Sequence, residues 1–214
     1  MAIARATGSS YPIIVDSVAP GTSITSGTFS TNEATALVVV TVGWQNFSGV
    51  VQHPLTVAWS GSTPAGASTF TKQVEFAFTG SGANAGGTSI WTATLSQTIS
   101  AQAVVITPQT GDPNDSVSAS IDILTGASTT MGVSNGQASA GGSSVARNVT
   151  LNGITAGSWI YVGAGSETFP LTVVDANTTQ IDQTASTNGL VCAVGVNNTG
   201  TSGNINVGWA ASAA

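Results

Sequence analysis

The chain has 214 residues, of which 41% are hydrophobic, so it holds enough apolar material for a packed core. Only 6% of its residues are charged, whereas an average soluble domain has about 25%. This combination excludes a disordered chain, which pairs low hydrophobicity with high charge, and a coiled coil, which needs abundant Lys, Arg and Glu.

The basic residues are too few to recognise an anionic partner. The net charge is −6, and the three cations are Arg5, Lys72 and Arg147. Binding to nucleic acid or to an anionic membrane needs clustered Lys and Arg, so we expect neither partner. The longest strongly apolar stretch, Leu37–Val42, is far below the roughly 18 residues of a membrane span. No apolar run of signal-peptide length precedes Tyr11, so we expect synthesis and folding in a cytoplasm.

Strand-like patterns extend along the whole chain. In chain order, strands are expected near residues 11–18, 22–29, 37–42, 55–60, 74–79, 88–95, 101–107, 117–123, 145–151, 158–164, 171–175, 178–184, 190–196 and 204–210. Most of them alternate apolar with small polar residues, as a half-buried strand does. The continuous apolar runs 37–42 and 190–196 predict strands that are covered on both faces. Helix formers are scarce, so no long helix is expected.

These patterns predict an all-β fold, a jelly-roll-like antiparallel β-sandwich. A Gly/Ser/Ala-rich connector at 128–144 divides the chain into an N-terminal part, 1–127, and a C-terminal part, 145–214. The tetrapeptide Pro54–Val57 recurs as Pro170–Val173, which is compatible with two half-repeats in one sandwich or with two smaller sandwiches in tandem. We favour the single sandwich, because about 70 residues alone would bury little core.

No group of residues has the spacing of a catalytic or metal site. His53 is the single histidine, and it lacks the neighbouring nucleophile and carboxylate of a triad. Asp112 and Asp115 do not fit a calcium loop, whose glycine and glutamate positions hold other residues here. A weak cation site near Asp112 and Asp115, or near Asp175 and Asp182, stays open. We therefore predict a protein that is not an enzyme, with no catalytic residues, no metal and no cofactor.

The aromatic residues are candidates for the core or for a contact surface. Trp59, Trp91 and Trp209 are in phase with apolar strand neighbours, which predicts core positions. Trp159 and Tyr161 share the face opposite to their apolar neighbours. They either cover a second sheet face or form an aromatic contact patch.

Cys192 is the single cysteine, so no intrachain disulfide is possible. It alternates in phase with Leu190, Val194 and Val196. A lone cysteine in such a strand usually behaves as a small hydrophobe, so we predict a buried free thiol.

The predicted outward positions carry Ser, Thr, Asn, Gln, Gly and Ala, and Ser118 and Ser120 are expected on one such outward face. Arg147 is in phase with apolar residues. A charged side chain in such a position must either pair with another group or reach a sheet edge. A free cytosolic domain usually carries mixed charges that oppose association, and interface cores are depleted in charge. We therefore expect a homo-oligomer or a component of a larger protein assembly.

Several segments together resemble β-sandwich surface proteins of tailed bacteriophages, namely head decoration proteins, head fibres and tail-associated adhesion modules. These segments are Gly27–Phe29, Ala36–Trp44, Leu55–Ser60, Ser89–Leu95, Ser118–Ala127 and Gly157–Gly165. The resemblance covers most of the chain and lies in strand spacing and composition, so no functional residue is carried over. It implies a virion protein that decorates or reinforces a capsid by binding its protein lattice.

Two other functions remain as alternatives. A tail-fibre or receptor-binding or carbohydrate-binding module would present exposed aromatic residues such as Trp159 and Tyr161. A glycosidase would need two carboxylates facing each other across a cleft, and the nine acidic residues are scattered.

Overall fold

The chain is built from antiparallel strands wherever the computed structural model describes it. The described residues are 3–6, 13–16, 23–46, 56–79, 85–108, 115–128, 132, 134–136, 146–167, 171–173, 178–184, 190–197, 200 and 202–211. They contain strands and no helix, which confirms the predicted all-β class. Accordingly, none of these segments is a helix that could cross a membrane.

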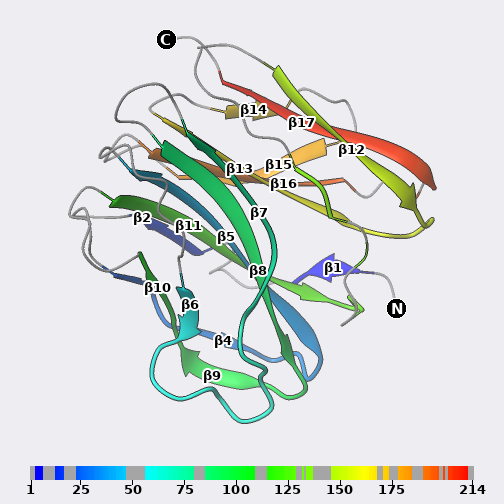
Figure 1. Cartoon of the computed structure of the whole chain (residues 1–214). Coiled ribbons are helices and arrows are strands. Elements are labelled where there is room, and N and C mark those ends of the chain that lie inside the picture. The colour runs from blue at the N-terminus through cyan, green and yellow to red at the C-terminus, as the bar shows by residue number, and fades with distance from the viewer. Residues whose placement is uncertain are drawn as a thin grey trace.

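The strands up to residue 125 form three sheets (Figure 1). Sheet A has the order β1–β11–β5–β8–β7, with β2 also paired to β11. Its strands are β1 (Ala4–Arg5), β2 (Ile13–Asp16), β5 (Ala36–Asn46), β7 (Thr71–Thr79), β8 (Ala85–Leu95) and β11 (Asp115–Thr125). Sheet B has the order β3–β10–β6, and sheet C pairs β4 with β9. Their strands are β3 (Ile24–Thr25), β6 (Thr56–Trp59), β10 (Val104–Thr107), β4 (Phe29–Thr31) and β9 (Ile99–Gln102).

In the described part of the chain, the strands after residue 145 pair only with one another. Sheet D has the order β12–β17–β14, and sheet E has the order β13–β16–β15. Their strands are β12 (Ala146–Ile154), β13 (Ile160–Glu167), β14 (Leu171–Val173), β15 (Thr178–Gln183), β16 (Leu190–Asn197) and β17 (Gly203–Ala211).

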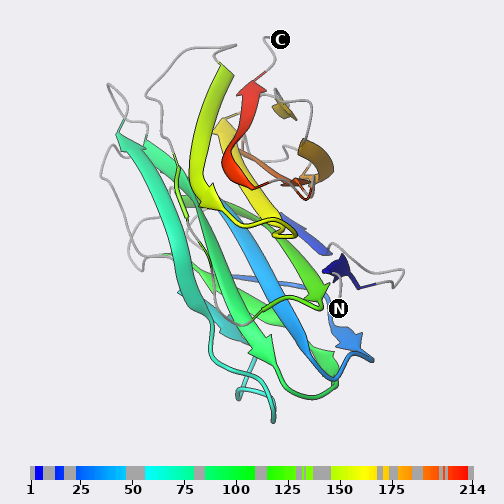
Figure 2. The same cartoon turned by 90° about the vertical axis from the view of Figure 1, so that its right-hand side faces the viewer.

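The sheets stack as four layers, in the order B with C, then A, then E, then D (Figures 1 and 2). Each half of the chain thus has two layers of its own with an apolar core between them. The sequence instead favours a single sandwich shared by both halves. The difference arises because sheet A is covered on both faces, by sheets B and C on one side and by sheet E on the other. A jelly-roll order of the strands stays a prediction.

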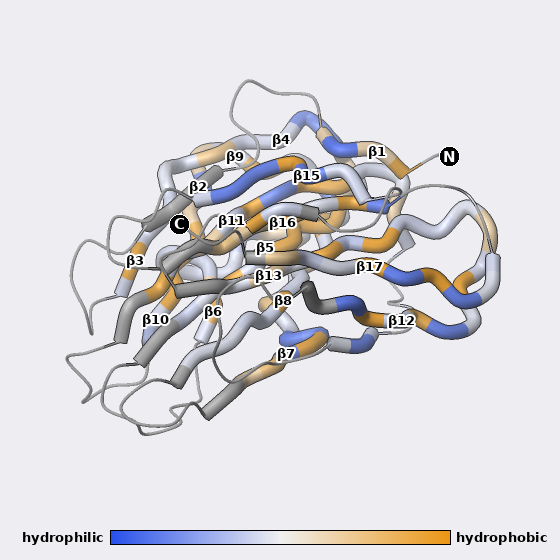
Figure 3. The backbone as a smooth tube through the Cα atoms, turned by 90° about the horizontal axis from the view of Figure 1, so that it is seen from above, coloured by the Kyte–Doolittle hydropathy of each residue, from blue (hydrophilic) through white to orange (hydrophobic). Residues whose placement is uncertain are grey.

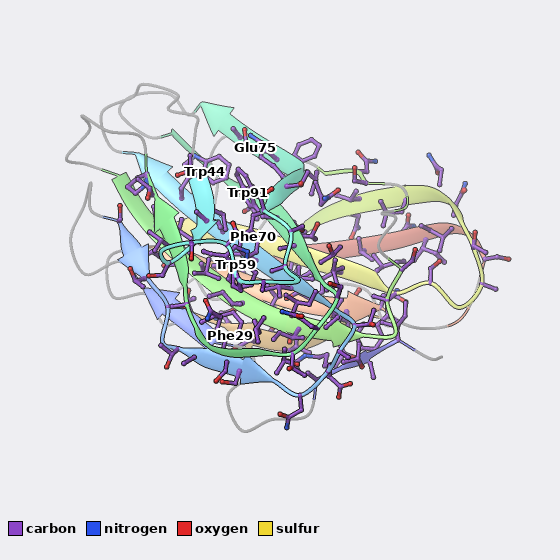
Figure 4. All side chains as sticks on the ribbon, turned by 90° about the horizontal axis from the view of Figure 1, so that it is seen from below. Phe29, Trp44, Trp59, Phe70, Glu75 and Trp91 are labelled. Carbon is purple, nitrogen blue, oxygen red and sulfur yellow. The ribbon has the colours of Figure 1, made fainter. Side chains whose placement is uncertain are left out.

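The first core lies between sheet A and sheets B and C. Val40 and Ile121 point into it from sheet A, and both are fully buried. The rings of Phe29, Trp59 and Phe70 lie in succession across this core, with centroids 6.2 Å apart between Phe29 and Trp59 and 4.9 Å apart between Trp59 and Phe70 (Figure 4). The Trp59 indole N–H donates to the Ser68 carbonyl at 2.9 Å, so its polar atom is satisfied. This arrangement confirms the predicted core position of Trp59.

The second core lies between sheets D and E. Leu151 and Val207 point into it from sheet D, together with Trp209, and Val162 and Ala193 point into it from sheet E. Hydrophobic and hydrophilic residues alternate along β12 and β17, so the opposite face of sheet D is polar (Figure 3). The burial of Trp209 agrees with its predicted core position.

Two of the predicted strands are each divided in the structure. The segment 22–29 becomes β3 and the start of β4, and the segment 101–107 becomes the end of β9 followed by β10. At the first break the Ser26 hydroxyl accepts from the Val104 N–H at 2.9 Å and donates to the Gly27 carbonyl at 2.9 Å. The hydroxyl bonds the backbone of the neighbouring strand at the point where the chain leaves sheet B for sheet C.

Sheets A and E approach each other closely because glycines face one another across them. A Cβ added at Gly43 would lie 3.7 Å from the Cα of Gly165 and 3.4 Å from the Cβ of Cys192. Packed sheets usually lie about 10 Å apart because their side chains interdigitate. Here the backbones themselves come into contact, which only positions without a side chain allow.

The polar face of β11 is buried in this contact. Ser118 and Ser120 were expected on an outward face, but each is only 1% exposed. The prediction of an outward position is therefore wrong. Ala119 and Ile121 do face the first core, so the predicted alternation along β11 is present. The small polar residues on the other face, however, pack in the A–E contact instead of facing water.

Gly163→Ala should destabilise the chain by about 1–3 kcal/mol, because the new methyl group overpacks the contact between the sheets. The added Cβ would lie 2.5 Å from Cγ2 of Thr41, a fully buried and stiff β-branched side chain. Urea denaturation followed by tryptophan fluorescence measures the change. Gly27→Ala is the matched control, since nothing lies within 4 Å of its added Cβ. Equal stability of the two variants would contradict the close A–E contact.

Candidate functional site

The candidate residues Trp159 and Tyr161 lie between sheets A and E. Both are partly buried and pack against the buried cluster of Leu37, Val39 and Leu124 on sheet A. This position agrees with the first of the two alternatives, in which Trp159 and Tyr161 cover a second sheet face. An aromatic contact patch formed by the two residues stays a prediction.

The contact between the sheets also contains a buried ion pair. The Arg5 Nε donates to the Asp122 Oδ2 at 2.7 Å, and the Ile123 N–H donates to the other carboxylate oxygen at 2.9 Å. The Asp122 side chain is 0% exposed, whereas that of Arg5 is 26% exposed. Strand β1 brings the cation to this position, since Arg5 pairs with Leu124 of β11.

Two carboxyl groups, one from each half of the chain, have raised pKa values. Burial raises the pKa of Asp122 above its ordinary value of 3.8, against the opposing effects of the Arg5 guanidinium and the Ile123 amide. Burial likewise raises the pKa of Asp182 on β15; the Gln183 amide and Arg5 oppose this rise, and Asp122 adds to it. Both carboxyl groups therefore bind their protons more tightly than in water.

Several hydroxyl groups are buried in the same contact, namely Thr41 Oγ1, Ser120 Oγ and Tyr161 OH. Thr41 lies beside the Tyr161 hydroxyl, and burial raises the pKa of that hydroxyl well above 10. The Tyr161 hydroxyl therefore stays neutral at physiological pH. The contact therefore buries polar side chains beside apolar ones.

Cys192 is fully buried in this contact, as predicted, and forms no disulfide. Its Sγ lies 3.8 Å from the Thr41 carbonyl oxygen, to which the thiol donates. Its backbone N–H donates to the Thr184 hydroxyl at 2.9 Å. A thiol in this position is shielded from solutes.

Several residues singled out from the sequence lie outside the described residues. They are His53, Asp112 and Asp175. For Asp115 and Arg147 the strand position is described but the side chain is not. In the described part of the chain, no three His, Cys, Asp or Glu side chains come close enough together to hold a metal ion.

The pairing of Arg5 with Asp122 was not predicted from the sequence. The available signal was a single carboxylate, Asp122, on the small polar face of a strand, in a chain with only three cations. A charge in that position needs a partner once the face is covered. The two residues are 117 positions apart, and no local pattern connects them.

Trp91 is only partly buried, although the sequence predicts a core position for it. It packs against the edge of the first core, and its indole N–H donates to the Ser89 hydroxyl at 2.8 Å. The Lys72 Nζ lies 5.6 Å from the ring centroid and 2.7 Å from the Glu75 Oε2. The ammonium of this ion pair thus lies over the face of the indole ring.

Comparison with models of protein families gives no match to this chain, and no curated protein or solved structure matches it. A function must therefore be proposed from the surface and the contacts of the chain itself.

Asp122 and Asp182 should make a contribution to the free energy of unfolding that falls as the pH rises from about 4 toward neutral. Both pKa values are raised in the folded chain, so folding is accompanied by proton uptake. The contribution is complete below the ordinary carboxyl pKa and is lost as the pH rises through the raised values. Urea denaturation at a series of pH values measures it.

Asp122→Asn should flatten this decline, because a neutral amide replaces the group that binds the proton. Glu33→Gln, which removes an exposed carboxylate, is the matched control. The prediction would be contradicted if the stability of the wild type rose over the same pH range and Asp122→Asn showed the same slope. Burial would then not be the main influence on the pKa of Asp122.

Proposed function

We propose that this chain is a non-enzymatic structural protein of a tailed-bacteriophage particle, which decorates or reinforces the capsid by binding its protein lattice. It reaches the virion after synthesis in the host cytoplasm, and it associates with copies of itself. The proposal is supported by the resemblance in strand spacing and composition and by the chemistry of the exposed surface.

The small number of charged residues on the described part of the surface is the observation that carries the proposal. Among the exposed residues that the structure describes, Glu33 and Lys72 are the only charged ones. Lys72 is itself neutralised by Glu75. Every other exposed residue in these ranges is Ser, Thr, Asn, Gln, Gly or Ala. A described surface with so little charge favours association with copies of the chain or with a neutral lattice, because charge depletion is typical of interface cores.

The outer face of sheet D is the contact surface that this chemistry favours. It carries the exposed residues Asn148, Thr150, Asn152, Asn204 and Asn206. The Thr150 hydroxyl donates to the Asn206 Oδ1 at 2.7 Å across the paired strands, which orders the two side chains. Side-chain amides both donate and accept, so such a face can bond polar groups of a protein partner without any charge. This face replaces the one containing Ser118 and Ser120, which is buried.

Asn148→Lys combined with Asn204→Lys should impair binding, because two cations on the contact face would have to be desolvated. The measurement is co-sedimentation of the purified chain with tailed-phage particles that lack it, together with its mass in solution. Thr25→Lys combined with Thr56→Lys, on the exposed face of sheet B at the other end of the stack, is the matched control. Wild-type binding should change little between low and high salt, since screening acts mainly on charges.

A steep loss of binding with salt would contradict a neutral contact. If the control pair alone impairs binding, the lattice contacts sheet B instead of sheet D. A monomeric chain that ignores the particles but binds a glycan would favour a tail-fibre or receptor-binding module.

A further inference from the structure

Two neighbouring residues of the connector 128–144 contact both halves of the chain. The Asn135 Nδ2 donates at 2.9 Å to the carbonyl oxygen of Thr150, which belongs to β12 of sheet D. Gly136 lies against the ring of Phe76 on β7 of sheet A, so closely that an added Cβ would overlap the ring carbons. The segment therefore touches the first half at Phe76 and the second half at Thr150.

Strands β7 and β12 are edge strands in the described part of the chain, since β7 ends the order of sheet A and β12 ends that of sheet D. Both lie along the same flank of the stack when it is viewed from above (Figure 3). Sheets A and D are not neighbouring layers, because sheet E lies between them (Figure 1). The Asn135–Gly136 segment thus connects two layers that are not paired with each other, at edges that a covering loop commonly protects.

The Asn135 side chain uses both ends of its amide. Its Oδ1 accepts from the Gly136 N–H at 2.8 Å, while its Nδ2 donates to the Thr150 carbonyl. Asparagine commonly bonds the adjacent backbone in this way, which fixes the local course of the chain. A side chain that is already held by its own backbone loses little further freedom when it also bonds β12.

Gly136 is the position where the connector requires a residue without a side chain. Glycine loses more conformational freedom on ordering than any other residue, so a glycine that is held in place needs a compensating contact. The partly buried ring of Phe76 supplies this contact. Gly132 of the same connector differs, since no atom lies within 4 Å of its added Cβ. The close contact is therefore a property of Gly136 and not of every glycine in the connector.

We infer that Asn135 and Gly136 form a strap that docks on this flank, with Phe76 as its site on the first half and Thr150 as its site on the second. The occupant of the docking surface is the chain's own connector. The surface takes an uncharged side chain that both donates and accepts, followed by a residue without a side chain. The strap ties sheet D to sheet A through contacts that lie outside the contact between sheets A and E.

Limited proteolysis of the full chain with subtilisin tests the strap. Mass spectrometry of the fragments gives the cleavage rate at the two peptide bonds of Gly136, and each rate is divided by that of the matching synthetic peptide. Cleavage follows the population of the undocked segment when docking is fast. Gly136→Ala should raise the cleavage rate by roughly tenfold or more, because the new methyl group overpacks the contact with Phe76.

Gly132→Ala is the matched control, since it adds the same methyl group to the same connector in open space. It should leave cleavage at Gly136 unchanged. Equal rates in Gly132→Ala and Gly136→Ala would overturn the strap.

Asn135→Asp tests the tie to the second half. The carboxylate keeps the shape of the amide and the acceptor for the Gly136 N–H, but it cannot donate to the Thr150 carbonyl. Cleavage at Gly136 should therefore rise. Asn152→Asp, the same change at an exposed position of β12, is the control and should have no effect. An unchanged rate in Asn135→Asp would show that the strap does not tie the two halves. No phage particle enters these measurements, so a failure of lattice binding leaves their result unaffected.

Discussion

The arrangement of the whole molecule depends on the absence of side chains where sheets A and E meet. Gly43 on β5 and Gly165 on β13 face each other, so that two sheet backbones touch where side chains would normally interdigitate. This contact fixes the distance between the two sandwiches. It also puts the hydroxyls and the carboxylate of β11 out of reach of water. The burial of Asp122, Tyr161 and Cys192 therefore follows from the glycines.

The ion pair is the electrostatic counterpart of this steric constraint. A carboxylate in a dry contact is costly unless it is paired, and the sequence supplies only three cations. One of them, Arg5, occupies the rim of the contact, where its partial exposure lowers its own desolvation cost. The pair compensates for a buried charge more than it adds net stability, which explains why a protein so poor in charge retains it.

The sequence predicts the strands because alternation and apolar runs reflect burial directly. Leu37–Val42 is apolar at every position but Thr41, and β5 is indeed covered on both faces. The same reasoning misplaces Ser118 and Ser120, because alternation separates two faces of a strand without showing what covers each one. Glycines within strands were the overlooked signal. Gly43, Gly163 and Gly165 weaken a strand unless a backbone approaches there, and together they mark the second covered face.

The pairing of β1 with β11 has a consequence for how the chain acquires its structure during synthesis. Arg5 is made 117 residues before Asp122, an interval on the order of ten seconds at typical ribosomal speeds. Sheet A cannot be completed until β11 has emerged, so its topology is dominated by non-local pairing, which folds slowly. The second sandwich follows β11 in the chain and docks on a face that is finished only then. Because Arg5 is synthesised before Asp122, the cation is already present when the carboxylate is first covered. The nascent chain therefore does not bury an unpaired charge at this position.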